Sequence, residues 1–236
     1  MYAELHAHSA FSFLDGASLP EELAGAAAEL GYGAFALTDH NSLSGSMEFA
    51  QAAKGLGLKA IHGAEIDLDD GRHVTLLVDT QEGWSSLCRI LTRAHARARD
   101  PGDPPPAVPL ETLEEHTAGL VCLSGCARQG VHDEPTLRRL RAAFGPEQLF
   151  VELQRPFQRH DRARNRRLAE IAGGLGLATV ATGNVHAHAH VRAPCAGSLE
   201  PVDAGIGRRV GSSERLAGRV GSRPIRKVLD RPSRND

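Results

Sequence analysis

The chain has 236 residues, of which 41% are hydrophobic and 24% charged, enough for one large globular domain or two small ones. Its net charge of −2 argues against a protein that binds nucleic acid through overall charge. Four cysteines are too few for a disulfide framework, and we expect neither a signal peptide nor a membrane span, which together predict a cytoplasmic protein with reduced thiols.

The first half of the chain alternates short apolar runs with helical patterns. Ser18-Leu-Pro20-Glu-Glu, with a hydroxyl residue, an early proline and two acids, is typical of a helix start, and Gly31 marks the end of that helix. Asp69-Asp70-Gly71 is a hairpin signal between two apolar runs. The strands expected here cover residues 3–6, 34–37, 58–68 and 73–78. The helices expected here cover residues 20–30, a segment from a cap at Ser42 or Ser44 to about 55, and 81–98.

The second half continues the alternation after a proline-rich loop at residues 100–106. The strands expected here cover residues 119–126, 149–153 and 177–182, and the helices cover 110–116, 135–144 and 159–173. Strand–helix alternation predicts a parallel α/β fold, and the number of strands suits a barrel better than a three-stranded sheet. In such barrels the chemistry lies at the carboxyl ends of the strands.

Metal-ligand residue types recur at these strand ends. His6 and His8 are two positions apart, so both side chains point to the same face of a strand. Asp15 follows after a short loop and can close on the same ion. Two surface histidines near the N-terminus are the alternative interpretation. The other strand ends carry Asp39 and His40, Glu65, Cys126, and Asn184 with His186.

Imidazole, carboxylate and thiolate together favour Zn²⁺, Mn²⁺ or Fe²⁺ over Mg²⁺ and Ca²⁺, which prefer oxygen ligands. More donors than one ion needs imply a multinuclear site. Bridged cations lower the pKa of a bound water and supply a nucleophile at neutral pH. The natural substrate of clustered cations is a phosphate ester, whose negative charge grows in the transition state.

Taken in order, these motifs resemble those of the PHP (polymerase and histidinol phosphatase) domain. The likeness is to the N-terminal PHP domain of bacterial C-family DNA polymerases, the DNA polymerase III alpha subunits, and within them to the error-prone branch. It covers residues 2 to about 190. The motifs are His6-Ala-His8-Ser with Asp15-Gly16, Leu37-Thr-Asp-His40-Asn, Gly63-Ala-Glu65, Leu123-Ser-Gly-Cys126 and Ala181-Thr-Gly-Asn184-Val-His186.

The resemblance implies a distorted TIM-like (βα)7 barrel that holds a cluster of three divalent metal ions, an expectation that the family rather than the spacing supplies. It assigns catalytic roles to the ligands His6, His8, Asp15, His40 and Glu65. The remaining metal positions that it implies are His95, Cys126, Asn184 and His186. It also implies a phosphate-ester substrate such as a single-stranded DNA 3′ end, and the rest of the polymerase chain as a partner.

Asn184 departs from the family pattern, where full sites have an aspartate. A neutral amide is a poorer ligand and does not bridge ions by charge. Three functions therefore stay open: a metal-dependent phosphoesterase or 3′–5′ nuclease domain, a stand-alone phosphatase resembling histidinol-phosphatase, and a catalytically silent structural module of a polymerase.

Several other residues have two interpretations. Asp39 either orients His40 or caps a strand end, and Glu152 either faces the site or is a buried packing partner. His73 reads as structural or exposed. His188 and His190 are poorer ligand candidates than His186. The arginine-rich helices read as solvated faces rather than as nucleic-acid contacts, which would need a continuous basic patch.

The chain divides into a metal-dependent phosphoesterase-like domain at residues 1–190 and an Arg/Gly-rich tail of low order at residues 191–236. The tail has 10 Lys/Arg and 5 Asp/Glu, a net charge of +5, so the total of −2 leaves −7 for residues 1–190. Its scattered Gly, Arg, Ser and Pro show no periodicity. We interpret it as the out-of-frame end of a truncated polymerase gene, the alternative being the disordered tail of a stand-alone protein.

Overall fold

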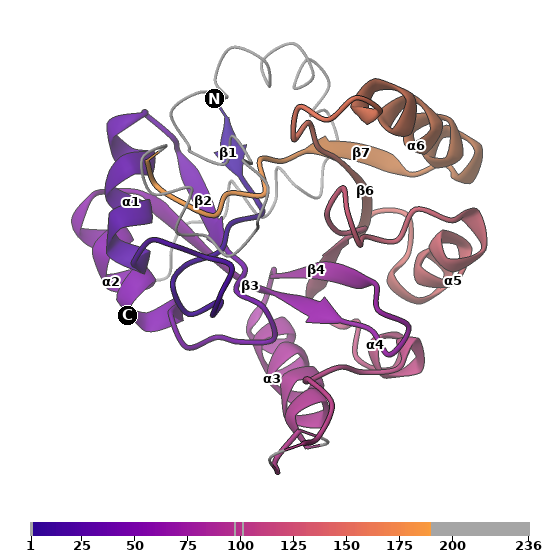
Figure 1. Ribbon diagram of the computed structural model, residues 1–236, viewed down its shortest axis with the longest axis horizontal. Coiled ribbons are helices and arrows are strands. Elements are labelled where there is room, and N and C mark those ends of the chain that lie inside the picture. The colour runs from indigo at the N-terminus through magenta and orange to yellow at the C-terminus, as the bar shows by residue number, and fades with distance from the viewer. Residues whose placement is uncertain (1, 97, 101, 190–236) are drawn as a thin grey trace.

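The computed structural model describes residues 2–96, 98–100 and 102–189 (Figure 1). The predicted tail and His190 lie outside these described residues. Strands and helices alternate along the chain. The strands are β1 (Ala3–Glu4), β2 (Ala34–Leu37), β3 (Lys59–Asp67), β4 (His73–Val78), β5 (Leu120–Leu123), β6 (Leu149–Leu153) and β7 (Ala178–Ala181). The helices are α1 (Pro20–Glu29), α2 (Ser46–Gly55), α3 (Gln81–His95), α4 (Leu110–Glu115), α5 (Glu134–Phe144) and α6 (Asp161–Leu175).

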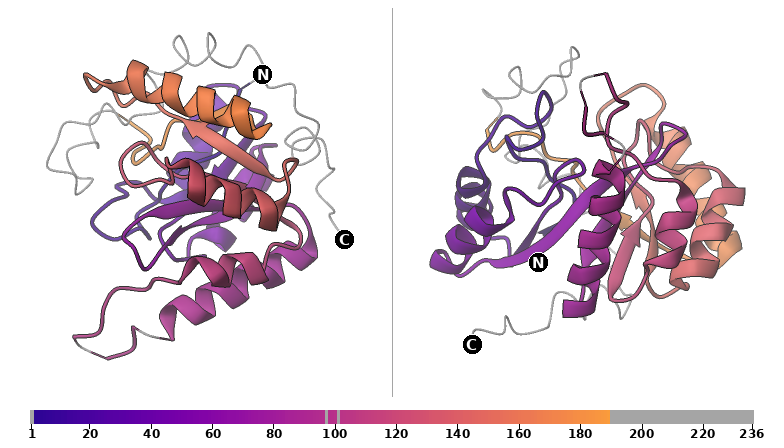
Figure 2. Two further views of the ribbon diagram at one scale, coloured as in Figure 1. Left: turned by 90° about the vertical axis from the view of Figure 1, so that its right-hand side faces the viewer. Right: turned by 90° about the horizontal axis from the view of Figure 1, so that it is seen from below.

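The strands form one curled sheet in the order β1-β2-β3-β4-β5-β6-β7. Figure 1 looks into the curl, with α1 and α2 on one side, α3 and α4 below, and α5 and α6 on the other side, and Figure 2 shows the helices outside the sheet. The expected TIM-like α/β fold is confirmed. The parallel prediction holds for four strand pairs, whereas β4 runs antiparallel to both β3 and β5 because a hairpin reverses the chain at Asp69-Asp70-Gly71.

The two ends of the curled sheet meet beside β1. Ala7 and Val185 form a parallel bridge, with His8 N donating to Val185 O at 2.7 Å and Val185 N donating to His6 O at 3.0 Å. The buried Glu4 carboxylate accepts a hydrogen bond from Gly183 N at 2.9 Å. These contacts close the barrel at the rim where the first and last predicted ligands lie.

The barrel interior has an apolar layer below a polar one. One buried cluster draws members from every strand or its immediate extension, which requires that these side chains meet inside the curl: Leu5, Ala34, Ala36, Ile61, Leu77, Val121, Leu123, Phe150 and Val180. Because residues two or four apart on a strand share a face, Glu65 lies above Ile61 on β3, and Glu152 lies above Phe150 on β6. The strand pattern therefore places charged side chains at the rim and apolar side chains at the opposite end of the barrel interior.

The outer helices pack on the other sheet face. α3 is amphipathic and begins at Thr80, whose hydroxyl accepts a hydrogen bond from Gly83 N, and it buries Leu87 and Ile90 against the sheet. Within the described ranges, every helix is too short or too polar to cross a bilayer.

Candidate metal centre

All but one of the predicted donors gather at a single rim cavity. Its walls come from the carboxyl ends of β2, β5, β6 and β7, from the loop after β1, and from β3. The lining donors are His8, Asp15, His40, Glu65, Cys126, Asn184 and His186. His6 lies directly beneath them, fully buried against Glu65. The exception is His95.

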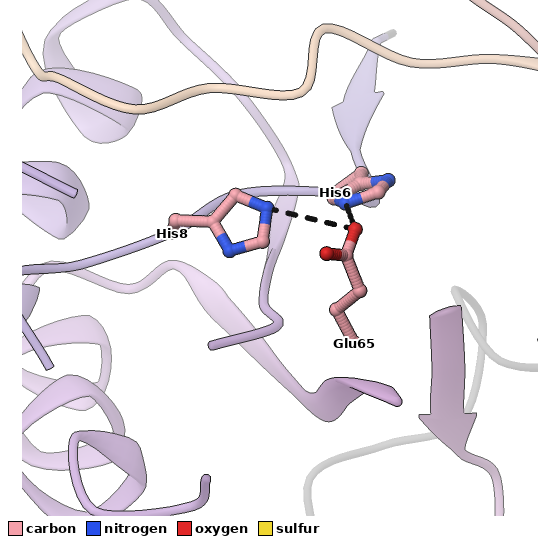
Figure 3. A group of neighbouring side chains, drawn as sticks. All are labelled: His6, His8 and Glu65. Atoms are coloured by element: carbon pink, nitrogen blue, oxygen red, sulfur yellow. Dashed lines mark hydrogen bonds and ion pairs between the residues drawn. The ribbon is translucent and has the colours of Figure 1, made fainter. Parts of the chain in front are cut away.

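Glu65 is the hub of the cluster. One carboxylate oxygen, Oε2, lies 2.9 Å from His6 Nε2, 3.2 Å from His73 Nε2 and 3.9 Å from His8 Nε2. The other oxygen, Oε1, lies 2.8 Å from His40 Nδ1. Figure 3 shows His6 and His8 both directed at the Glu65 carboxylate. A carboxylate placed among four imidazoles has the position of a bridging ligand.

His6 is fixed from behind by Glu152. His6 Nδ1 donates to Glu152 Oε1 at 2.7 Å, which leaves Nε2 facing Glu65. Glu152 is itself held by Gln154 Nε2 at 2.6 Å and by the Thr182 hydroxyl. Of the two interpretations of Glu152, the structure therefore favours a site-facing residue that orients a donor, an arrangement common around metal-binding histidines.

Asp15 joins two further imidazoles. Its Oδ2 lies 3.1 Å from His40 Nε2 and 2.9 Å from His186 Nδ1. His8 stacks between the same two rings, with centroids 4.5 Å from His40 and 4.9 Å from His186. His8 Nε2 also donates to Asn184 Oδ1 at 3.1 Å. Residues from the first, second and last strand ends thus converge on one point.

Asp39 holds the loop that carries Asp15. Its carboxylate accepts from Ser9 N at 2.6 Å, Ser9 Oγ at 2.8 Å and Ser12 Oγ at 2.7 Å. Ser12 Oγ in turn accepts from His40 N at 3.1 Å. Asp39 therefore acts on the site through the loop and the His40 backbone, and within the described residues its carboxylate makes no hydrogen bond to the His40 ring.

His73 belongs to the cluster although its sequence position reads as structural. It is 3% exposed, and its Nε2 accepts from Cys126 N at 3.1 Å as well as lying near Glu65. The signal lay in the hairpin register: Asp67 pairs with His73 and Glu65 with Thr75, so all four share one face of the two strands. The same register brings in Asp67, which with His40 and Glu65 forms one of three donor groups whose atoms lie within 4.8 Å of one another.

His95 lies apart from this cluster. It is the last residue of α3, on the outside of the sheet, and its Nε2 donates to Asn41 O at 2.8 Å. It lines a separate surface hollow with Ser42, Ser44 and Thr92. Its ring therefore reaches the loop that follows His40 from outside the sheet and does not enter the cavity. His188 is likewise occupied elsewhere, with Nδ1 2.8 Å from Ser18 Oγ.

In this cluster, neighbouring carboxylates oppose the effect of burial on the pKa values of the histidines. Burial lowers the pKa of His6, but Glu152 and Glu65 raise it to about 10. Burial likewise opposes protonation of His40, whose pKa Glu65 and Asp15 raise to about 11. Burial and the charge on His40 together lower the pKa of His8. Two imidazolium ions therefore offset part of the negative charge of Asp15, Glu65 and Glu152 when no cation is present.

The acids respond in the opposite direction. Burial favours neutral Glu65, but His73, His40 and His6 lower its pKa well below the usual range. Burial also raises the pKa of Asp15, and hydrogen bonds from His186 and His40 outweigh this and lower it. Burial, with the charge of Glu65, raises the pKa of the Cys126 thiol to about 12. Cys126 is thus a thiol at neutral pH unless a cation stabilises its thiolate.

The donors fit divalent cations. Burying several imidazoles and carboxylates together is costly unless each is paired or binds a metal. The buried Oε2 of Glu152 lacks a hydrogen-bond partner within the described part of the chain, and the buried Nδ1 of His186 has only its contact with Asp15. Three overlapping groups of His, Asp and Glu place their donor atoms within 4.8 Å. Nitrogen, oxygen and one sulfur donor suit Zn²⁺, Mn²⁺ or Fe²⁺.

Comparison with known proteins gives a consistent assignment. A family model for the PHP domain matches residues 4–156. The error-prone DNA polymerase of Symbiobacterium thermophilum is 38% identical over 209 residues, covering 78% of this chain and 19% of that protein. That of Anaeromyxobacter dehalogenans is 39% identical over 202 residues, covering 81% and 17%. The chain thus spans about a fifth of the length of these curated relatives.

Solved structures share the fold at low identity. A candidate metal-dependent phosphoesterase from Bifidobacterium adolescentis aligns with a TM-score of 0.59 at 18% identity, over 78% of this chain and 87% of that one. An amidohydrolase from Chromobacterium violaceum, with bound sulfate and no metal, aligns with a TM-score of 0.59 at 20% identity, over 79% and 88%. The lesion-specific endonuclease Q from Pyrococcus furiosus aligns with a TM-score of 0.52 at 15% identity, over 78% and 48%.

Proposed function

Because the chain belongs to the PHP domain family, we propose that its rim cavity is a divalent-metal centre that hydrolyses phosphate esters. The observation that carries the proposal is the convergence of five imidazoles on the two carboxylates of Glu65 and Asp15. Such a set of donors is costly without a cation and is suited to several.

The proposed ligands include His73 in place of His95. His73 lies inside the cluster with its ring beside Glu65, whereas His95 lies outside the sheet and lines a separate hollow. The full proposed set is His6, His8, Asp15, His40, Glu65, His73, Cys126, Asn184 and His186. The earlier expectation of three ions of zinc, manganese or iron is retained as part of the proposal. Bound there, the cations would supply Lewis-acid stabilisation of charge on a phosphate ester.

The protein's own groups prepare this site. Glu152 fixes the His6 ring so that Nε2 faces the cavity. The Asn184 side-chain oxygen fixes the His8 ring in a different way, because it binds Nε2, the nitrogen that faces Glu65. Asp39 holds the loop that presents Asp15. At the mouth, the exposed guanidinium of Arg128 lines the cavity and attracts a phosphate anion.

The relatives suggest a wider context, which we also propose. The chain corresponds to the PHP region of an error-prone DNA polymerase, with the rest of such a polymerase as its partner and a nucleic-acid end as its substrate. A cytoplasmic location in DNA replication or repair suits that role, as do the free thiols of Cys88, Cys122 and Cys126.

A catalytically silent structural module is the second candidate, and Asn184 favours it. The neutral amide lies against His8 where a carboxylate would add charge, and the thiol of Cys126, which lines the same cavity, has a raised pKa. A weakened half of the site can bind metal for stability and still fail to turn over substrate.

Elemental analysis of the purified protein, before and after dialysis against a chelator, tests the proposal first. Hydrolysis of bis(p-nitrophenyl) phosphate and p-nitrophenyl phosphate then separates phosphodiesterase from phosphomonoesterase activity. We expect bound metal and chelator-sensitive hydrolysis of the diester. Metal without turnover of either ester would select the silent module, and absence of metal would reject both.

A further inference from the structure

Four residues other than glycine have a positive φ in the described structure, and all four adjoin the rim cavity. They are Leu14 (φ 65°), Asn41 (φ 46°), Phe157 (φ 65°) and Asn184 (φ 49°). Asparagine tolerates this conformation, but leucine and phenylalanine do so only under strain. Strained backbone is concentrated at functional sites. Leu14 precedes the cavity residue Asp15, and Phe157 lies between the cavity residues Pro156 and Gln158.

Phe157 is held in an exposed position by a fixed loop. Residue 154 at one end of the loop has its carbonyl bound by Arg164 at 2.8 Å and by Asn165 at 2.9 Å. At the other end, Gln158 N donates to the buried Asp161 carboxylate at 3.0 Å. Phe157 is nevertheless 52% exposed. The exposure of this ring is therefore a property of the folded loop and not of a loose segment.

Arg155 supports the ring. Its guanidinium carbon lies 5.8 Å from the Phe157 centroid, within the range of a cation–π contact. The Nε atom of Arg155 is shielded and has no hydrogen-bond partner in the described residues. An arginine beside an exposed aromatic ring is the combination with which proteins hold a nucleobase and its phosphate.

The loop after β1, which contributes Asp15 to the cavity lining, carries a second exposed apolar tip next to that residue. Phe13 is 85% exposed and Leu14 is 89% exposed. This loop is also rigid, since Asp39 accepts three hydrogen bonds from it. A Cβ added to Gly16 would lie 1.9 Å from Ser9 O, so the loop closes too tightly for any other residue there.

The two sides of the cavity mouth differ in charge. On the side of Phe157, Arg128 and Arg155 are without an ion-pair partner in the described part of the chain, and glutamines 154 and 158 line the wall, while Gln129 borders both sides. On the far side, the adjoining hollow is lined by Asp67, Asp69 and a run of prolines at 104–106. A phosphate chain is attracted to the first side and repelled from the second.

We propose that Phe157, supported by Arg155, stacks an unpaired nucleobase and so directs a single-stranded nucleic-acid end into the rim cavity, with Phe13 as the opposing wall. This inference rests on the proposed phosphoesterase function and assigns the residues that would select its nucleic-acid substrate. The stacking contact would make the site prefer single strands to duplexes. An unpaired base exposes the π-face that the Phe157 ring needs, whereas a base inside a duplex does not.

The test measures binding of a fluorescein-labelled ten-thymidine oligonucleotide to the metal-loaded protein by fluorescence anisotropy, with a gel to show that the oligonucleotide stays intact. Phe157→Ala should weaken binding about 5- to 100-fold, the range of one lost stacking contact. Phe157→Trp should restore binding, because an indole stacks at least as well. Arg155→Ala should weaken binding and reduce its salt dependence. Met47→Ala is the matched control, since Met47 is 65% exposed on α2.

Metal content and melting temperature of each variant show whether the site still folds. Wild-type affinity in Phe157→Ala with normal metal content would overturn the inference and would indicate that another protein segment covers this apolar rim. Failure of the wild-type protein to bind the oligonucleotide would overturn it too, even if bis(p-nitrophenyl) phosphate is hydrolysed. Phe157-dependent binding without hydrolysis of any ester would instead reject the enzymatic proposal and retain the binding platform.

Discussion

The two halves of the barrel rim carry different kinds of donor. The half built from β1 to β4 supplies His6, His8, His40 and His73 around the shared Glu65 carboxylate. The half built from β5 to β7 supplies a thiol, an amide and a single imidazole. Its buried carboxylate, Glu152, faces His6 from behind.

This difference predicts unequal metal affinity in the two halves of the site. The first half contains a charged hub with imidazoles on several sides, which is the arrangement for tight binding of a cation. In the second half, Asn184 brings no charge and Cys126 must lose a proton of raised pKa before it can act as a thiolate ligand. We therefore expect metal ions to be held unequally, most tightly beside Glu65 and least tightly beside Asn184. Each prediction below tests that inequality.

The largest effect is expected for Glu65→Gln. The amide keeps the shape of the side chain but removes the charge that four imidazoles face, so metal affinity should fall by at least about 100-fold and hydrolysis should be lost with it. Metal titration followed by elemental analysis measures this. Glu111→Gln, at an exposed carboxylate that binds Arg139, is the control. Full metal content in Glu65→Gln would contradict the hub role.

Metal affinity should also rise steeply with pH. In the metal-free protein, His6 and His40 have pKa values raised to about 10 and about 11, so both are protonated at neutral pH. A metal ion that binds one of these rings must displace its proton. For each proton released, metal affinity should rise about tenfold per pH unit, until the pH reaches the pKa of that ring. Calorimetry in buffers of different ionisation enthalpy counts the protons. Binding that is independent of pH would show that these rings are not ligands.

The pair His73→Ala and His95→Ala tests which histidine completes the first half. His73→Ala should lower metal affinity about 10- to 100-fold, because its ring lies against Glu65. His95→Ala should leave metal content unchanged and cost about 1 kcal/mol of unfolding free energy for the lost hydrogen bond to Asn41. Metal titration and thermal melts measure both variants, and the reverse result would restore His95 to the ligand set.

The smallest expected effect, and the one of opposite sign, belongs to Asn184→Asp. Aspartate tolerates the positive φ of this position, and its charge should strengthen the weaker half, raising the affinity for the last-bound ion about tenfold. Stepwise metal titration resolves that ion from the others. No change in the weakest binding step would mean that Asn184 is not the source of the inequality.

Much of this fold follows from local sequence. The bounds expected for β2, β4 and β6 agree with the structure because apolar runs of that length, limited by turn residues, have few alternatives. The start of α2 was less accurate: neither Ser42 nor Ser44 caps it, and the helix begins after Gly45 without a side-chain cap. Here the loop that holds His40 sets the helix start, which no local pattern encodes.

The site was predictable where motif order matters and less so where strand register matters. His6, His8, His40, Glu65 and His186 converge as expected. His73 was missed because its role depends on pairing with Asp67 across a hairpin, and such pairing is visible only once the two strands are aligned. Phe157 and Leu14 carry no sequence signal at all, since exposure and a positive φ are properties of folded loops.

The bridge between Ala7 and Val185 has a consequence for biosynthesis. The earliest and latest donors are brought together by the two extremities of the domain, so a nascent chain leaves the ribosome with its first histidines long before their partners exist. Until His186 has left the ribosome, the edge of β1 is unpaired and only some of the metal ligands are available. Loading with metal is therefore expected to be a late event in the life of the molecule, after translation of the barrel is complete.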